Sequence, residues 1–287
     1  MVLPKPWGAA RFSFASRLTE RISDRDSATV LADRAIWRGL TAVVVFVVLA
    51  KVIGAAKEVV VAWRFGVGHT ADAYLFLFTL VSWPVGIWAS VLPPVVLPLL
   101  ARLNAQRASA RDGFQAQLFG LTLLLGVVLA VVAWFGLPRV LGSDLAGLSA
   151  PAQAVGMAIT PMLAMTLPLG FVAALWAAWT MSEGRHLNTL AEGVPALGIL
   201  LALVAFSSAA AWAWGTVAGM IGQCLLLWVA IGRRATLRPE FRFDSPEWRA
   251  FGGGFTMLLV GQFLMSLTAV VDQFFAARLG EGAISTL

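Results

Sequence analysis

The chain has 287 residues, of which 59% are hydrophobic and only 13% are charged, and its mean hydropathy is +0.83. Soluble globular domains carry about 25% charged residues, so this composition excludes a soluble fold. The net charge of +6 comes from Lys and Arg placed between apolar runs, which excludes a nucleic-acid-binding face. Because runs of about 20 apolar residues recur along the chain, we predict an all-α polytopic membrane protein.

The first 38 residues mix basic and acidic side chains and have no apolar core of signal-peptide length. We predict that they form a cytosolic extension, with an amphipathic stretch around residues 12–22 as a surface-lying segment. A transit peptide is the alternative, although such peptides avoid acidic residues.

Seven membrane spans are predicted to follow. Their approximate ranges are 39–63, 73–100, 114–137, 154–181, 190–207, 212–232 and 250–277. The second span contains four prolines, each of which removes a backbone donor, so we expect that helix to kink or break. The three glycines at 252–254 indicate a hinge or close packing at the start of the seventh span.

This pattern divides the chain into four predicted regions. They are a cytosolic N-terminal extension (1–38), a six-helix transmembrane lobe (39–232), a cytoplasmic linker (233–249), and helix seven with the start of a second lobe (250–287). With the N-terminus inside, most Lys and Arg residues fall on the inner side, and the outer side holds only Arg64, Arg139 and Arg278. This imbalance predicts that the N-terminus lies in the cytoplasm.

The first span carries three charges, Lys51, Lys57 and Glu58. A charge at the bilayer centre costs about 2.5–3.5 kcal/mol, whereas each Val or Ile returns only about 0.3–0.6 kcal/mol. Glu58 follows Lys51 by seven residues and returns to nearly the same helix face, about 10 Å further along the axis. We therefore predict that this helix lines a polar cavity. The alternative for Lys57 and Glu58 is extension to the outer interface near Trp63, without a ligand.

Other polar residues have simpler interpretations. Asp72 precedes an apolar helix, which favours an N-cap role. For Asp272, near the end of the seventh span, a cavity acid, a partner for a basic residue and an interfacial charge all stay open. His69 and His186 lie in predicted loops without a second ligand at metal-binding spacing, so we predict that both are solvated and that the chain holds neither metal nor cofactor.

The run KVIGAAKEVVVAWRFGVGHTADAYLFLF, followed by a proline-containing span that ends in VLPLLARL, resembles the opening of the MurJ/MviN family of lipid II flippases in the MOP exporter superfamily. The end of the chain, VVDQFFAARLGEGAISTL, resembles helix seven of that family and the turn toward helix eight. The resemblance implies a fourteen-helix transporter with two lobes, of which this chain holds the first lobe and helix seven.

The function implied by the resemblance is outward movement of a polyprenyl-diphosphate-linked saccharide across the bacterial cytoplasmic membrane by alternating access. The implied partners are this lipid-linked substrate, membrane lipids and a C-terminal lobe that this chain does not contain. By the same resemblance, Lys51 and Lys57 occupy the two basic positions of helix one, Glu58 its adjacent acid, and Asp72 the acid that opens helix two. Together with Asp272 they make up the predicted substrate cavity.

Two departures from the family pattern bear on the substrate. The family usually has Arg at the two basic positions, and Lys binds a diphosphate as a point charge without the bidentate fork of Arg. The basic pair and acid that the family carries in the middle of helix two are replaced here by PVGIWASVL. Another lipid-linked oligosaccharide or a glycolipid therefore stays open as the substrate.

Two other classes of function, an antiporter and an enzyme, agree less well with the sequence. A cation-coupled antiporter of the same superfamily would require acids in the core of the lobe, and spans three to six offer almost none. An enzyme of polyprenyl-phosphate metabolism would require clustered acids, His or Arg on an aqueous loop, and no predicted loop has such a cluster. The glycines at 252–254 also lack the Lys and Ser/Thr of a nucleotide-binding loop. We predict a transporter and not an enzyme.

Overall fold

The computed structural model describes residues 41, 43–106, 108–183, 190–232 and 238–286. The chain divides into two compact units, Met1–Val48 and Leu49–Leu287. Of the first unit, only residues 41 and 43–48 are described, and they are helical. The predicted extension at 1–38, His186 and residues 233–237 of the predicted linker lie outside the described residues.

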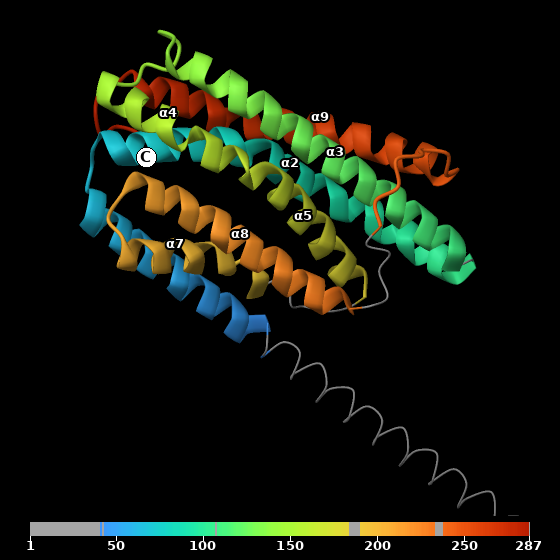
Figure 1. Cartoon of the computed structure of the whole chain (residues 1–287). Coiled ribbons are helices and arrows are strands. Elements are labelled where there is room, and N and C mark those ends of the chain that lie inside the picture. The colour runs from blue at the N-terminus through green and yellow to red at the C-terminus, as the bar shows by residue number, and fades with distance from the viewer. Residues whose placement is uncertain (1–40, 42, 107, 184–189, 233–237, 287) are drawn as a thin grey trace, which may run out of the picture. The chain divides into compact units, whose positions relative to one another are not determined.

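Helices are the regular secondary structure of the described part of the chain, which contains no strand. After a first helix over residues 43–65, the elements are α2 (His69–Gln106), α3 (Ala108–Leu141), α4 (Ala150–Ala164), α5 (Thr166–Ser182), α7 (Val194–Ala205), α8 (Ala209–Ile231) and α9 (Glu247–Ala277) (Figure 1). Within these residues, α2, α3, α8 and α9 are long and apolar enough to cross a membrane, and α4 with α5 forms a fifth candidate. The predicted all-α membrane fold is confirmed.

The proline-induced break lies in a different span from the predicted one. Helix α2 continues past all four of its prolines, so they do not break it, and a kink at these prolines stays a prediction. The predicted fourth span is instead divided at Met165, where α4 and α5 meet with a bend of 40°. Pro168 has no N–H to donate to the Ala164 carbonyl, and its ring crowds that carbonyl. At the bend, the Thr166 hydroxyl donates to the Leu163 carbonyl at 2.6 Å, which satisfies an acceptor that the helix would otherwise pair.

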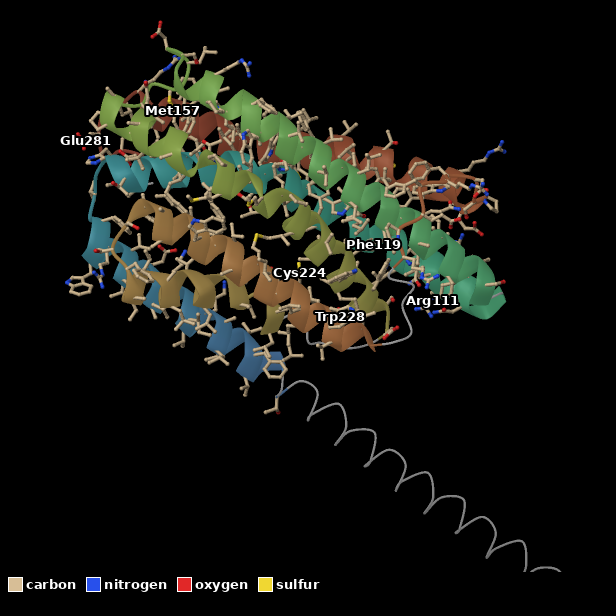
Figure 2. The ribbon with its side chains drawn as sticks, viewed as in Figure 1. Arg111, Phe119, Met157, Cys224, Trp228 and Glu281 are labelled. Atoms are coloured by element: carbon tan, nitrogen blue, oxygen red, sulfur yellow. The ribbon has the colours of Figure 1, made fainter. Side chains whose placement is uncertain are left out.

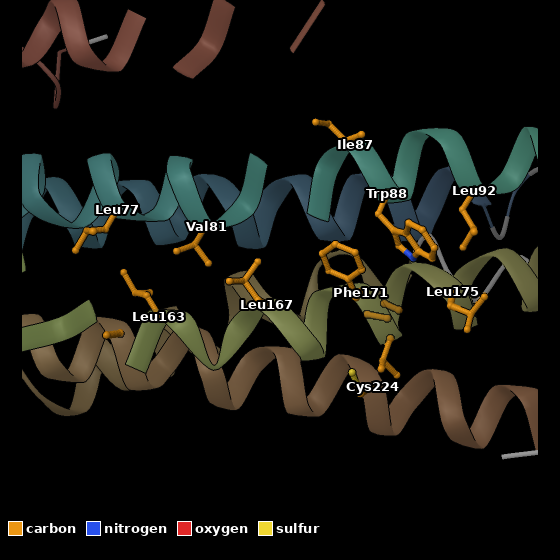
Figure 3. Packing of buried hydrophobic residues seen from close by; sticks show 14 of the residues in the cluster. Leu77, Val81, Ile87, Trp88, Leu92, Leu163, Leu167, Phe171, Leu175 and Cys224 are labelled. Atoms are coloured by element: carbon orange, nitrogen blue, oxygen red, sulfur yellow. The ribbon is translucent and has the colours of Figure 1, made fainter. Parts of the chain in front are cut away.

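The core lies between α2 and the α4–α5 pair. Figure 3 shows Leu77 of α2 opposite Leu163, and Trp88 of α2 opposite Phe171 of α5. The rings of Trp88 and Phe171 are stacked with their centroids 5.4 Å apart. In a membrane, apolar side chains are not driven together by water, so these contacts stabilise the lobe through close packing.

An aromatic stack joins three helices at the start of α8. The Trp212 ring of α8 lies between Phe65, at the end of helix 43–65, and Tyr74 of α2, with centroid distances of 5.0 and 3.8 Å. The hydroxyl groups of Tyr74 and Thr216 are hydrogen-bonded at 2.7 Å. This arrangement fixes the end of helix 43–65 beside α2 and α8.

Helices α7 and α8 pack with their backbones in contact. A Cβ atom added at Gly198 of α7 would lie 2.5 Å from the Cα atom of Gly219 in α8, and one added at Gly219 would lie 2.7 Å from the Cα atom of Pro195. Glycine is required at both positions because any side chain would push the helices apart.

We predict that Gly219→Ala destabilises the α7–α8 pair. The added methyl group overpacks the contact with Pro195, at a cost of about 1–3 kcal/mol. Thermal unfolding of the purified chain in detergent should show a lower Tm than that of the unsubstituted chain.

The matched control is Gly136→Ala in α3, where a Cβ atom would meet nothing within 4 Å. Its Tm should be unchanged or raised, because Ala is the better helix former. Equal Tm values for the two variants would contradict the close backbone contact.

Candidate functional site

Helix 43–65 is set apart from the membrane-span candidates by its charges. Every stretch of 18 residues within it contains Lys51, Lys57 and Glu58, so it exceeds the charge that an apolar span of that length tolerates. Burying three charges in lipid would cost several kcal/mol. This helix therefore requires water or polar partners along part of its surface.

The structure places these charges on two faces of the helix. Lys51 and Glu58 are exposed and lie on one face, next to the exposed Val52 and Val59. Lys57 is half-buried and lies on the packed side, one heptad before Arg64. We call the face that carries Lys51, Val52, Glu58 and Val59 the open face.

The packed side is fixed to α7 at both of its ends. Arg64 Nη2 donates to the Val204 carbonyl at 3.2 Å, at the C-terminal end of α7, where helix carbonyls lack intrahelical partners. Toward the N-terminus of the helix, Ala50 lies against Gly193, which precedes α7. A Cβ atom added at Gly193 would lie 3.0 Å from the Cβ atom of Ala50. Packing against α7 therefore leaves the open face uncovered by it.

The three charges do not act alike. Lys57 Nζ and Glu58 Oε1 form an ion pair at 2.6 Å, with 22% and 66% of the two side chains exposed. Lys51 forms no ion pair with any residue that the structure describes. The open face thus presents the ammonium group of Lys51, which has no ion pair there, and the carboxylate of Glu58, which is paired with Lys57. Such a face can attract an anion as a point charge but cannot clamp it bidentately.

Asp72 has a different role from the predicted N-cap. Helix α2 begins at His69, so Asp72 lies within its first turn, and its own N–H donates to the Gly68 carbonyl at 3.0 Å. Its side chain is 3% exposed and accepts hydrogen bonds from the backbone amides of Gly282, at 2.5 Å, and Ser285, at 2.9 Å. The N-cap prediction is wrong because the amides that Asp72 satisfies belong to the segment after α9.

The segment after α9 in turn caps α2. The Glu281 carboxylate accepts from the His69 backbone amide at 3.2 Å and lies 3.3 Å from His69 Nδ1. His69 is exposed, as predicted, and the contact with Glu281 is one that the sequence did not predict. Gly282 has φ +88°, and a Cβ atom there would collide with Val67, so only glycine fits this turn. We call these mutual hydrogen bonds of Asp72 and Glu281 the reciprocal cap.

The remaining predicted residue, Asp272, is exposed on α9 and has no ion pair among the described residues. Of the five predicted cavity residues, the structure brings Lys57 and Glu58 into contact. It joins Lys51, Asp72 and Asp272 to none of the others by a hydrogen bond or ion pair within the described ranges. A cavity of about 260 Å³ lies beside the reciprocal cap, between Asp72, Glu281 and Ser149.

Two larger cavities are apolar. One of about 780 Å³ lies along α7 and α8, and one of about 520 Å³ lies between α3, the α4–α5 bend and α8. Both are lined almost wholly by aliphatic and aromatic side chains, so they suit acyl chains and not a charged headgroup. No three His, Cys, Asp or Glu side chains converge on a metal-sized site in the described part of the chain.

Sequence reasoning missed Glu281 and the ion pair between Arg111 and Glu183, at 3.6 Å. Figure 2 shows Glu281 and Arg111 at opposite ends of the helices. The Gly-Glu-Gly sequence at 280–282 was the available signal for Glu281, because flanking glycines with positive φ indicate a tight turn. The ion pair between the start of α3 and the end of α5 has no comparable local signal.

Comparison with known proteins gives two matches. The chain is 25% identical to the lipid II flippase MurJ of Burkholderia cenocepacia over 272 residues, which cover 87% of this chain and 51% of that protein. A solved structure of lipid II flippase MurJ in an inward closed conformation matches 85% of this chain and 52% of its own, with a TM-score of 0.71 and 15% identity. No family model matches the chain.

These matches establish a MurJ-like relationship with the N-terminal half and a shared helical fold. The chain spans about half the length of each protein that it matches. The predicted resemblance is confirmed, and the chain is a multi-pass membrane protein. Its orientation in the membrane stays a prediction from the Lys and Arg distribution.

We predict that Asp72→Asn loosens the segment after α9. The amide that replaces the carboxylate keeps one acceptor but turns an NH₂ group toward a backbone amide, and hydrogen bonds to a charged group contribute about 1.5–3 kcal/mol. Hydrogen exchange of residues 280–286 should accelerate at least tenfold. Unchanged exchange would contradict the reciprocal cap.

We also predict that the open face is in contact with water. In a Cys224→Ala background, which removes the single cysteine, Lys51→Cys should react with a membrane-impermeant maleimide in nanodiscs. Val132→Cys is the control, because Val132 is 60% exposed in the structure but lies on the apolar helix α3, where we expect it to contact lipid and to be protected. Protection of both positions would place residue 51 in lipid and overturn the cavity.

Proposed function

We propose that this chain forms the first half of a flippase that moves a polyprenyl-diphosphate-linked saccharide, such as a lipid II-like peptidoglycan precursor, outward across the bacterial cytoplasmic membrane. The observation that carries the proposal is the similarity to half of a lipid II flippase over 87% of the chain. The shared fold supports a mechanism of alternating access, in which two helical halves rock around a central site.

The charges of helix 43–65 support a headgroup site on the open face. Lys51 is expensive to hold in lipid, so it requires water or an opposing charge. A diphosphate headgroup supplies that opposing charge. Glu58 reduces the positive potential through its ion pair with Lys57, which keeps the site from holding the anion too tightly to release it.

The exposed surface of α9 supports a second helical half as the partner of this chain. Only 6% of its most apolar stretch is buried. An apolar helix face of this length is covered either by lipid or by protein, and the matched proteins have about as much chain again. We therefore propose that residues 39–232 form one lobe, that 233–249 is a cytoplasmic linker, and that α9 begins the second lobe.

The middle of α2 bears on which lipid-linked substrate this half of the protein binds. The stretch PVGIWASVL contributes Trp88 to an apolar contact with Phe171 of α5 and Phe255 of α9, with centroid distances of 5.4 Å in each case. This half of the protein therefore offers headgroup-binding charge from helix 43–65 and none from mid-α2. Another lipid-linked oligosaccharide or a glycolipid is the alternative substrate.

A cation-coupled antiporter finds less support. Helices α4, α5, α7 and α8 contain no Asp or Glu at all, so their packed surfaces offer no carboxylate for a coupling ion. The proposal includes no covalent step, because moving a lipid headgroup across the membrane requires binding and release alone.

The proposal is tested by binding of undecaprenyl diphosphate to the chain in nanodiscs, measured by native mass spectrometry. Lys51→Met should weaken binding about tenfold, because a charge-assisted contact is lost while the apolar stem is kept. Glu58→Gln should strengthen binding, because Lys57 loses its competing partner.

Lys51→Arg, which keeps the charge, is the matched control and should bind at least as well as the unsubstituted chain. Undecaprenol, which lacks phosphate, should be insensitive to all three substitutions. Equal diphosphate binding by every variant would remove helix 43–65 from the headgroup site.

A further inference from the structure

An extended segment before α9 is docked on the surface of α3. Residues 238–245 are not helical, and the backbone amide of Glu240 donates to the Ala116 carbonyl of α3 at 3.0 Å. A Cβ atom at Gly120 would collide with the Glu240 carbonyl. The segment and α3 are therefore in backbone contact, which only glycine at position 120 permits.

One buried side chain of α3 binds this segment at three points. Gln117 is 5% exposed, and its Nε2 donates to Asp244 Oδ1 at 2.7 Å. Its Oε1 accepts from Trp248 Nε1 at 2.7 Å and from the Ser245 backbone amide at 3.3 Å. Gln117 thus joins the last two residues of the extended segment to the first turn of α9.

Aromatic contacts surround this network. Phe114, one turn before Gln117, packs edge-on against Trp248 and Phe251 at centroid distances of 5.4 and 6.1 Å. Phe243 of the segment packs edge-on against Trp248 at 5.5 Å. Phe114, Gln117 and Gly120 recur every three residues and so lie along one side of α3.

The rest of α9 packs along α2 with part of its surface, as in the contact of Trp83 with Phe263 at a centroid distance of 5.1 Å, and leaves the remainder uncovered. After Phe251, the buried residues of α9 are Val270, Ala276 and Ala277. Between them, Met257 and Met265 are 82% and 79% exposed, and Trp83 Nε1 donates to Ser266 Oγ at 2.9 Å as a mid-helix contact. The dense packing at its beginning thus gives way to a long and mostly uncovered middle.

We infer that residues 240–248 are a fixed anchor for the start of α9 and that Gln117 is its positioning residue, so that the direction in which α9 leaves α3 depends on Gln117. Gln117 itself is buried and its three hydrogen bonds are partly buried, so water competes with them less than it does at an open surface. The anchor holds whether or not the proposed substrate is correct.

The test is hydrogen exchange of the full chain in nanodiscs, followed by mass spectrometry of peptides that cover residues 238–255. Gln117→Leu removes all three hydrogen bonds and replaces the amide with an apolar side chain of similar size. Exchange in this region should accelerate on the order of 10- to 100-fold, while exchange at 280–286 stays unchanged.

Gln115→Leu is the matched control on the same helix. Gln115 is 1% exposed, and its Oε1 has no hydrogen-bond partner among the described residues. Its replacement should leave exchange at 238–255 unchanged. Acceleration by Gln115→Leu equal to that by Gln117→Leu would mean that any change in this part of α3 loosens the segment, and would overturn the assignment.

A reversed hydrogen bond separates positioning from general packing. Gln117→Glu should loosen the segment, because it places a carboxylate against that of Asp244. Adding Asp244→Asn restores a donor and acceptor pair in the opposite sense, since the new amide at 244 can donate to the carboxylate at 117. Exchange in the double variant should return toward the unsubstituted rate. A double variant as fast as Gln117→Glu alone, or a Gln117→Leu variant with unchanged exchange, would refute the anchor.

Discussion

The arrangement of α2 and α9 depends on two hydrogen bonds that the Asp72 carboxylate accepts from backbone amides in the segment after α9. A carboxylate that is 3% exposed is costly unless it is fully bonded, and here the amides of Gly282 and Ser285 provide the bonds. Glu281 returns the interaction by bonding the His69 amide. The end of α9 is thereby held at the start of α2, while Gln117 holds its beginning on α3.

Charge is distributed unevenly over the helices, and this sets where function can reside. Helices α4, α5, α7 and α8 carry no charged residue, and they pack through rings, aliphatic side chains and glycines. Among the described residues, the ion pairs between elements lie at helix ends, as in the pair of Arg111 and Glu183. Helix 43–65 is different because Lys51 and Lys57 lie well inside it. A helix embedded in lipid and without function would become more stable if these two lysines were replaced by apolar residues.

Local rules predicted the elements well and their long-range partners poorly. Apolar runs are a property of neighbouring residues, so α9 ends at Ala277 as predicted and begins at Glu247, three residues before the predicted start. Asp72 was assigned to its own helix because capping rules extend over about four residues, whereas its partners are 210 residues away or more. Proline content likewise gave no means of choosing between Pro168, which accompanies a bend, and the prolines of α2, which break no helix.

The open face offers an anion little directional information. Lys51 is a single flexible ammonium group, and the second lysine is half-buried and already paired with Glu58. Neither provides the planar fork that distinguishes a diphosphate from other anions. The apolar contact of Trp88 with Phe171 and Phe255 adds no charge from α2. Under the proposed function, this half would therefore attract the headgroup by charge, and recognition of its chemical identity would depend on groups in the opposing half.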